Sequence, residues 1–338
     1  MLRRCGLGIS LALVLIAVVA AGCSESDPTK GPDRTVEPKP VISKPAGPAD
    51  DGLVTASAPK VTEAFGPPKL EKLREKEPDS TRTDPIPPTG AVSYADVESV
   101  FREKRYQEAA ALFTRYTEQR PNSSWGHYMR GVSAWKDGDL TQAEEAFGHA
   151  LLLDPDHVKS LLNLSRVLLE QERFDEALEK TELAREINST SNAVHRLLAR
   201  SYYAQGRVDD AVDTYRHAII LDDLDAWSMN NLGLIFFEQR RFEEALPPLA
   251  RAVELREDVP QFQNNLGMVL EHTGRFVDAA KAYDRALVAD QGYDKAWVNL
   301  TRVEEVDEDS ELEPFDVAAT AERFVEDLRA WNESVPAS

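Results

Sequence analysis

A repeat of 34 residues runs from about residue 90 to residue 302 without an insertion or deletion, and it limits the possible folds more than any other feature. One position of the repeat is always alanine: Ala109, Ala143, Ala177, Ala211, Ala245 and Ala279. A bulky apolar residue stands three positions earlier: Tyr106, Leu140, Phe174, Val208, Phe242 and Phe276. A fixed period of this length indicates an array of stacked units, in which each unit buries its apolar face against its neighbours.

Each repeat contains two apolar stretches with three- and four-residue spacing, separated by a short turn such as residues 136–139. This spacing predicts two antiparallel helices per repeat. A column of mostly small residues lies in the first stretch: Gly131, Ser165, Ala199, Gly233, Gly267 and Thr301. Together with the alanines, this column predicts where the two helix axes approach closely, because a large side chain there would push the helices apart.

Several segments resemble the tetratricopeptide repeat (TPR). Asn-Asn-Leu-Gly opens first helices at residues 230–233 and 264–267, Arg-Phe-Glu-Glu-Ala opens a second helix at 241–245, and Leu-Asp-Pro ends one at 153–155. The family's closing proline also occurs at Pro121, but other residues replace it in four repeats: Ser189, Asp223, Glu257 and Gln291. The resemblance implies an all-α, right-handed superhelical solenoid of about six TPR helix pairs over residues 91–302, followed by a C-terminal capping helix.

Residues 1–22 have the pattern of an export signal. Arg3 and Arg4 precede an apolar run over residues 7–21, and small residues lead to Cys23. This pattern resembles the bacterial lipobox, so we expect a lipoprotein signal peptide and lipid attachment to Cys23. An ordinary cleaved signal with an incidental cysteine is the alternative, and a retained membrane helix is less favoured because the apolar run is short. Ser24, the residue after the cysteine, resembles the residue at this position in lipoproteins that are sent to the outer membrane. In a Gram-negative cell the protein would then face the periplasm.

Residues 23–90 are predicted to form a disordered tether after the lipidated cysteine. This segment holds 13 of the chain's 20 prolines and one aromatic residue, Phe65. Such a composition offers too little apolar surface to form a core. The tether would give the helical array reach from the membrane.

Residues 303–338 are predicted to form an acidic loop and the capping helix. The segment contains 12 acidic and 2 basic residues. After Pro314 an apolar stripe follows at helical spacing: Val317, Ala321, Phe324, Leu328 and Trp331. We expect this helix to cover the last apolar face of the array. The acidic run lacks the central glycine of a calcium loop, and Ala318 stands where a bidentate glutamate is required, so no calcium site is predicted.

No motif for catalysis is found. The six histidines are scattered, and the sequence has no HExxH, GxGxxG, P-loop or GxSxG pattern. We therefore predict no enzyme activity, no cofactor and no metal. The net charge of −20 argues against nucleic acid as a partner, because phosphate contacts need a basic surface.

Candidate binding residues lie on the first helices, which line the concave face in the family that the chain resembles. An asparagine column consists of Asn163, Asn231, Asn265 and Asn299. An amide offers a donor and an acceptor to a peptide backbone, but asparagine is also a common family residue at this position, and both interpretations stay open.

Basic residues are predicted to cluster in the third and fourth repeats of this acidic chain: Lys159, Arg166, Arg196 and Arg200. Arginine suits the capture of carboxylate, so we expect an acidic or C-terminal peptide. Neutralisation of Glu170 and Glu172 is the alternative. Trp125 and Trp135 are candidate aromatic contacts, although aromatic residues at these spacings more often pack between repeats than bind a ligand.

These features favour a lipid-anchored TPR adaptor that binds a protein or extended peptide in the cell envelope, for example in pilus, secretin or envelope assembly. The alternative is an accessory subunit that captures substrate for an envelope enzyme complex, such as a peptidoglycan hydrolase or a glycosyltransferase. Self-association through the stacked ends of the array is a third possibility.

Overall fold

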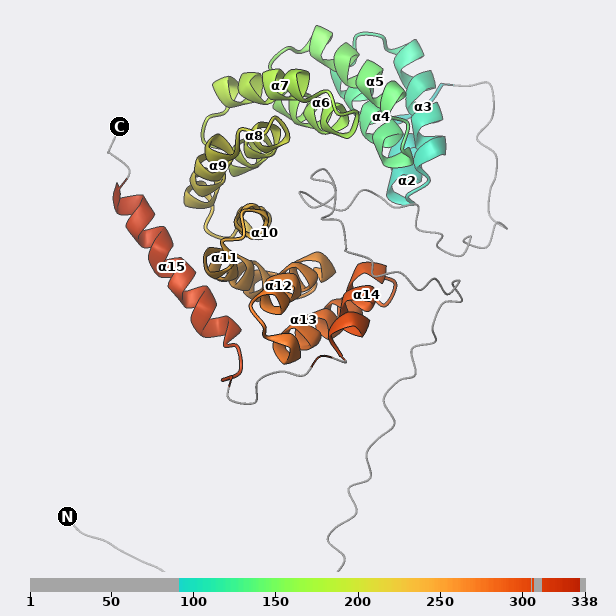
Figure 1. Ribbon diagram of the computed structural model, residues 1–338. Coiled ribbons are helices and arrows are strands. Elements are labelled where there is room, and N and C mark those ends of the chain that lie inside the picture. Colours follow the sequence, from blue (N-terminus) through green and yellow to red (C-terminus); the bar gives the residue numbers. More distant parts are fainter. Residues whose placement is uncertain (1–90, 305, 307–311, 335–338) are drawn as a thin grey trace, which may run out of the picture. The chain divides into compact units, whose positions relative to one another are not determined.

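A computed structural model describes residues 91–304, 306 and 312–334 of the chain. The chain divides into two units, residues 1–56 and 57–338, and all described residues belong to the second. The predicted signal peptide, Cys23 and the whole predicted tether lie outside the described residues. Where the chain is described, every regular element is an α-helix (Figure 1).

The helices form pairs, as the 34-residue period predicts. The first helices of the repeats are α2 (Tyr94–Arg102), α4 (Ser124–Asp137), α6 (Val158–Glu170), α8 (Asn192–Ala204), α10 (Ala226–Glu238), α12 (Pro260–His272) and α14 (Asp294–Val303). The second helices are α3 (Tyr106–Gln119), α5 (Leu140–Leu153), α7 (Phe174–Ile187), α9 (Val208–Leu221), α11 (Phe242–Leu255) and α13 (Phe276–Ala289). The last helix is α15 (Val317–Ser334). The predicted all-α repeat solenoid is confirmed, with six pairs from α2/α3 to α12/α13 and α14 without a second helix.

The column of small residues marks the close approach of the two helices in a repeat. A Cβ atom added to Gly131 would lie 2.6 Å from the ring of Phe147 on the partner helix. The same test at Gly233 gives 2.5 Å to the side chain of Leu249. The alanines of the second helices are fully buried at the same contacts.

The turn inside each repeat places one residue in the left-handed region. In alternate repeats this residue is glycine, with φ of 86° at Gly138 and 76° at Gly206 and Gly274. In the other repeats it carries a side chain, with φ near 60°: Lys104, Glu172 and Arg240. Glycine adopts this conformation at no steric cost, whereas the other residue types are strained there.

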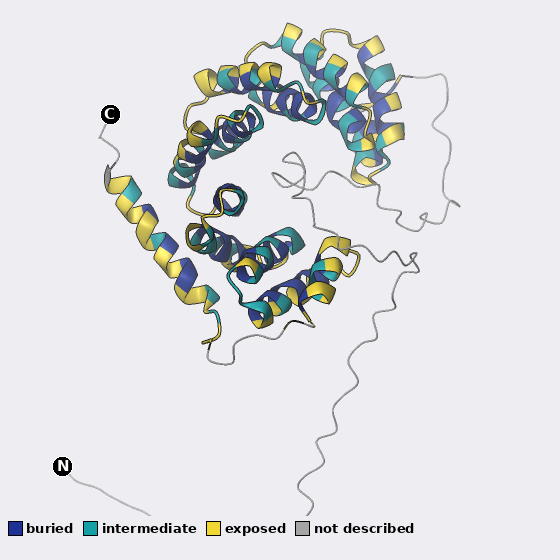
Figure 2. Ribbon diagram, viewed as in Figure 1, coloured by how far each residue is buried: buried dark blue, intermediate teal, exposed yellow. Residues whose placement is uncertain are grey.

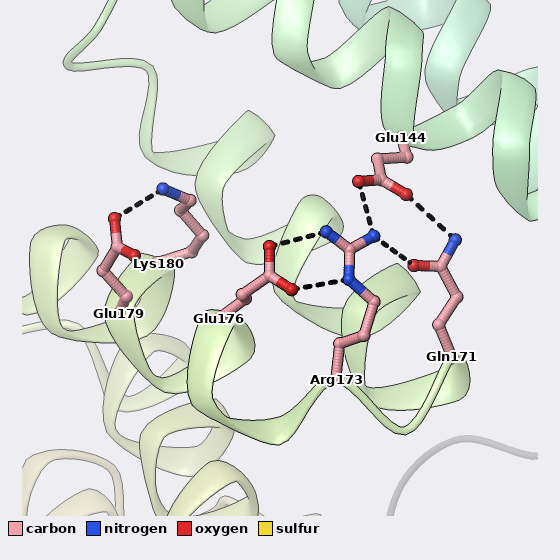
Figure 3. Close-up of polar contacts among 6 residues, drawn as sticks. All are labelled: Glu144, Gln171, Arg173, Glu176, Glu179 and Lys180. Carbon is pink, nitrogen blue, oxygen red and sulfur yellow. Dashed lines mark hydrogen bonds and ion pairs between the residues drawn. The ribbon is translucent and has the colours of Figure 1, made fainter.

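An arginine follows this turn in five of the six pairs and binds the carboxylate three residues later: Arg105, Arg173, Arg207, Arg241 and Arg275. Figure 3 shows the most connected example, Arg173, whose guanidinium binds Glu176 and also reaches Glu144 of the preceding repeat at 2.6 Å. Hydrogen bonds to Glu176 and Glu144 raise the pKa of Arg173. In four of the five pairs both side chains are about a third exposed or more, so each of these stabilises the array only slightly. The exception is Arg275, whose partner Asp278 is buried.

The buried apolar residues form three separate clusters. The first cluster runs from Val92 to Phe113, the second from Ala110 to Leu197, and the third from Ala199 to Leu328. The boundary between the second and third clusters falls inside α8. Helix α8 thus contributes residues to both clusters and joins them, and Phe101 packs against both the first and the second cluster.

The C-terminal helix exists, but its predicted position at the end of the array is wrong. Helix α15 packs mainly on α11 and also contacts α9, where Arg216 lies over the ring of Trp331 at 5.0 Å (Figure 1). Phe324 and Leu328 are buried in this contact, and one side of α15 stays exposed (Figure 2). The apolar stripe thus covers second helices of earlier repeats, and Val298 on α14 remains 56% exposed.

The segment before α15 explains this path. The backbone N–H of Phe315 donates to Asp278 at 2.8 Å, and Arg275 donates to the carbonyl oxygen of Glu313 at 2.7 Å. Both acceptor and donor belong to the start of α13, so the chain enters α15 beside that helix. Helix α15 then runs past α11 toward α9.

Candidate peptide-binding site

The first helices follow one another on one side of the array, and the second helices follow on the other (Figure 1). The face built by the first helices is here called the inner face. It carries three arginines on neighbouring helices: Arg166 on α6, and Arg196 and Arg200 one turn apart on α8. These three residues are here called the arginine cluster.

Arg196 is neutralised within the array. Its guanidinium binds the carboxylate of Asp225 at 2.5 Å, and the Asp225 side chain is 1% exposed. Asp225 also caps α10 by accepting from the backbone N–H of Ser228 at 3.3 Å. This arginine therefore has a structural partner from the next repeat.

Arg166 and Arg200 have no ion pair within the described part of the chain. Arg166 donates only to the side-chain oxygen of Asn163, which is neutral, and Arg200 makes no side-chain hydrogen bond to another described residue. Both residues are half-buried. Burial, followed by repulsion from Arg196 and Arg200, lowers the pKa of Arg166 to about 10. Burial also lowers the pKa of Arg200.

The surroundings add little negative charge. Lys136 lies close enough to Arg166 to have its own pKa lowered, first by burial and then by that arginine. Glu170 interacts favourably with the charges of both Arg166 and Arg200, and its carboxylate accepts from the indole N–H of Trp135 at 3.0 Å. Among the described residues neither Glu170 nor Glu172 forms an ion pair with the arginine cluster, so the neutralisation expected as the alternative is limited to the longer-range attraction of Glu170. The cluster is a half-buried positive site in an acidic protein.

The fourth predicted base lies apart. Lys159 is exposed in the first turn of α6, and nothing in the described structure brings its side chain to the cluster. Three of the four predicted bases are therefore together.

The asparagine column serves two different purposes. Asn231 is 1% exposed and donates to the hydroxyl of Tyr215 at 3.1 Å, so it does not line the inner face as predicted. Asn163 is also buried and donates to the hydroxyl of Tyr128 at 3.4 Å. Tyr215 lies on α9, the preceding second helix, and Tyr128 lies on α4, the preceding first helix.

Asn265 and Asn299 are half-buried and link successive repeats. Asn265 donates to the side-chain oxygen of Asn230 at 2.9 Å, and Asn299 donates to that of Asn264 at 2.8 Å. Each keeps its carbonyl oxygen and one N–H for another group. Asn230 and Asn264 were not predicted, although the paired Asn-Asn sequence in both repeats is a visible signal.

The two tryptophans take part in packing between repeats, and they do not meet. Trp125 contacts the rings of Phe113 and Tyr116 edge to face, with centroids 5.7 and 6.0 Å apart. Trp135 reaches α6 through its bond to Glu170. Of the two, only Trp135 contacts Glu170, the acid that interacts with the arginine cluster.

The family model of the tetratricopeptide repeat matches this chain in four overlapping segments, residues 128–193, 183–226, 196–260 and 230–294. Over residues 128–294 the helical repeat solenoid therefore matches the tetratricopeptide repeat.

Two curated proteins illustrate the similarity at the level of sequence. The TPR array is 33% identical over 116 residues to human tetratricopeptide repeat protein 7B, a match that covers 34% of this chain and 13% of that protein. It is 30% identical over 125 residues to Protein NPGR2 of Arabidopsis thaliana, with 35% and 17% covered. The chain thus spans less than a fifth of either relative, so their activities do not transfer.

Solved structures share the fold of the TPR array at low identity. A tetratricopeptide repeat protein from Parabacteroides merdae has a TM-score of 0.55 at 14% identity, over 62% of this chain and 82% of that one. The Cut9–Hcn1 hetero-tetramer gives a TM-score of 0.55 at 16% identity, over 62% and 42%. Identities this low show the fold alone.

None of the helices in the described part of the chain is long and apolar enough to cross a membrane. No group of three or more histidine, cysteine, aspartate or glutamate side chains in the same residues is arranged to hold a metal ion.

Proposed function

We propose that this protein is a lipid-anchored, non-enzymatic adaptor whose inner face binds a protein or an extended peptide at the arginine cluster. TPR arrays are interaction scaffolds, and this supports the general role. The observation that carries the proposal is the pair Arg166 and Arg200, two half-buried guanidinium groups that form no ion pair with another described residue. Their donors are therefore available to an anionic group of a partner.

The chemistry of the cluster favours an acidic partner. A guanidinium ion offers a planar set of donors that matches a carboxylate in two parallel hydrogen bonds. The carboxylate comes from an acidic side chain or from the C terminus of the partner. Asn265 and Asn299 lie further along the inner face and keep groups that suit the backbone of an extended peptide.

The anchor completes the proposal and rests on the sequence. Lipid attachment at Cys23 would hold the protein on the cell envelope, with the outer membrane facing the periplasm as the proposed site. The proline-rich segment up to residue 90 would let the array reach partners away from the bilayer. Replacement of Cys23 by serine is expected to move the protein from the membrane fraction to the soluble fraction.

Crosslinking in cells followed by mass spectrometry tests the binding role. The double variant Arg166→Ala/Arg200→Ala should lose the crosslinked partner that the unmodified protein captures. The matched control is Lys159→Ala/Arg207→Ala, which removes the same charge at exposed positions outside the cluster. Equal recovery of the partner by both double variants would overturn the proposal.

A further inference from the structure

Helix α14 ends the array with an uncovered side that faces away from α12. Val298 lies on this side and is 56% exposed. The equivalent residues one and two repeats earlier are Asn264 and Asn230, which are 3% and 1% exposed. The next first helix covers both of them, because Asn299 donates to Asn264 and Asn265 donates to Asn230. Val298 therefore occupies the position through which earlier repeats contact the next repeat.

The last first helix is more apolar at these positions than the helix before it. Val298 stands where α12 has the buried Asn264, and the half-buried Trp297 stands where α12 has the buried Gln263. The terminal unit of a repeat array normally has a polar outer face, because it meets water and not another unit. Here the composition changes in the opposite direction. An apolar face at the end of the array favours a contact with another molecule.

The charges beside Val298 suit a second copy of the same helix. Asp294 lies one turn before Val298 and Arg302 one turn after it, and both residues are exposed. Arg302 also binds Glu271 on α12 at 2.7 Å, and its side chain remains 41% exposed. A two-fold axis beside Val298 would run two α14 helices antiparallel. Asp294 of each copy then faces Arg302 of the other copy, and the two helix dipoles oppose each other. A parallel pair would place like charges together.

The opposite end of the array offers no matching apolar surface. In the described part of the chain, none of the exposed large hydrophobic side chains lies on α2 or α3. On α2, Arg102 binds Glu98 of the same helix at 2.9 Å. Stacking the end of one array on the beginning of another would thus set Val298 against polar groups. A contact between two α14 helices buries apolar against apolar surface and closes after two copies.

We propose that α14 is a self-association surface through which two copies of this chain pair antiparallel about Val298. The surface is separate from the arginine cluster, and the inference does not depend on the proposed function. Helix α14 has only 10 residues. Its contact is smaller than a standard interface of about 1,600 Å², so the dimer is weak and concentration-dependent. A dimer carries two arginine clusters and can engage a repeated partner at two points.

Cysteine crosslinking of the full chain tests the two-fold contact. Cys5→Ser and Cys23→Ser remove the native thiols, and Val298→Cys adds one at the proposed axis. The matched control carries Val288→Cys on α13, where the valine is 79% exposed. A residue beside a two-fold axis meets its own copy, as a disulfide requires a Cα separation of about 4.4–6.8 Å. Because the contact raises the effective concentration of the two thiols, the 298 dimer should form at least about tenfold faster than the 288 dimer.

A mixed sample tests the antiparallel register. Asp294→Cys and Thr301→Cys are prepared in separate copies of the same cysteine-free chain, and one of them carries a mass tag. Antiparallel helices place position 294 of one copy beside position 301 of the other, so the mixed disulfide should exceed both disulfides between identical copies. An excess of the two identical pairs would mean that the helices run parallel and would refute the proposed register.

Sedimentation velocity of the full chain with native Val298 measures the equilibrium without oxidation. A monomer–dimer equilibrium is expected, and Val298→Glu and Asp294→Arg should both shift it to the monomer. Asp284→Arg makes the same charge change as Asp294→Arg at an exposed position on α13 and should leave the equilibrium unchanged. Equal melting temperatures show that the variants keep the fold.

Two results would overturn the proposal. The first is a 298 disulfide that forms no faster than the 288 disulfide. The second is a dimer that persists in Val298→Glu, because association would then run through another surface. Neither result bears on the arginine cluster, whose partner binding is tested separately by the variants Arg166→Ala/Arg200→Ala.

Discussion

Arg166→Met is expected to make the fold more stable while it weakens binding. Burial, followed by repulsion from Arg196 and Arg200, lowers the pKa of Arg166 from its usual value to about 10 in the folded array. One pKa unit corresponds to about 1.4 kcal/mol, so at neutral pH the charged side chain costs the folded state roughly 3 kcal/mol. Because the lowered pKa means that the folded state binds this proton less tightly than the unfolded chain, the cost is complete below about pH 10 and fades only as the pH rises above that value.

The substitution removes the charge and keeps much of the apolar stem. Methionine loses the hydrogen bond to Asn163, which is worth about 1 kcal/mol, so a net gain of about 2 kcal/mol remains. For an array of this size, 1 kcal/mol moves the melting temperature by about 2–4 °C, so the variant should melt about 4–8 °C higher.

Differential scanning calorimetry at pH 7 checks the direction. The control is Arg207→Met, which removes an exposed arginine paired with Asp210 and should change the stability by less than about 0.5 kcal/mol. A melting temperature for Arg166→Met below that of both the unmodified chain and the control would refute the reasoning. It would mean that the guanidinium stabilises the array and is not a site held ready for an anion.

Three further predictions concern stability. Burial lowers the pKa of His127 and His195, so the folded array binds these protons less tightly than the unfolded chain. The stability of the array should therefore fall as the pH drops below 6.5. In the double variant His127→Gln/His195→Gln, the urea midpoint should change less between about pH 7.5 and 5.5 than it does in the unmodified chain. Gly131→Ala should destabilise the array by about 1–3 kcal/mol, because the new Cβ would lie 2.6 Å from the ring of Phe147. Gly148→Ala has open space around it and should stabilise α5 by about 0.5–1 kcal/mol. Urea titrations in which both variants change the stability in the same direction would contradict this contrast. Glu172→Gly should raise the melting temperature, since φ is 60° there and relief of the strain is worth about 1 kcal/mol; a lower melting temperature would show that the side chain compensates.

The arginines after the turns illustrate a signal that the sequence contains but that pattern reading missed. They recur at the 34-residue period with an acid three positions later, as in Arg173 and Glu176. Each pair is local and visible in the sequence. The link from Arg173 to Glu144, 29 residues away, depends on the packing of neighbouring repeats and appears only in the folded array.

The sequence alone determined the helix pairs and their stacking. Columns of alanine and small residues, such as Gly131 and Gly233, must lie where helices approach closely, and a regular period fixes these contacts without reference to distant parts of the chain. The arginine cluster was also predicted in large part, because Arg166, Arg196 and Arg200 occupy the same helix face in consecutive repeats.

Only the tertiary structure decided what each of these residues does. Arg196 is neutralised by Asp225, whereas Arg200 has no ion pair in the described array, and Asn231 turns inward to a tyrosine while Asn265 stays half-buried. The path of α15 was decided in the same way. Its apolar stripe fits several surfaces, and the hydrogen bond from Phe315 to Asp278 commits it to the second helices and not to the open end. A period in sequence specifies contacts between neighbouring units, but charge pairing and the docking of a non-repeated helix depend on which groups meet in space.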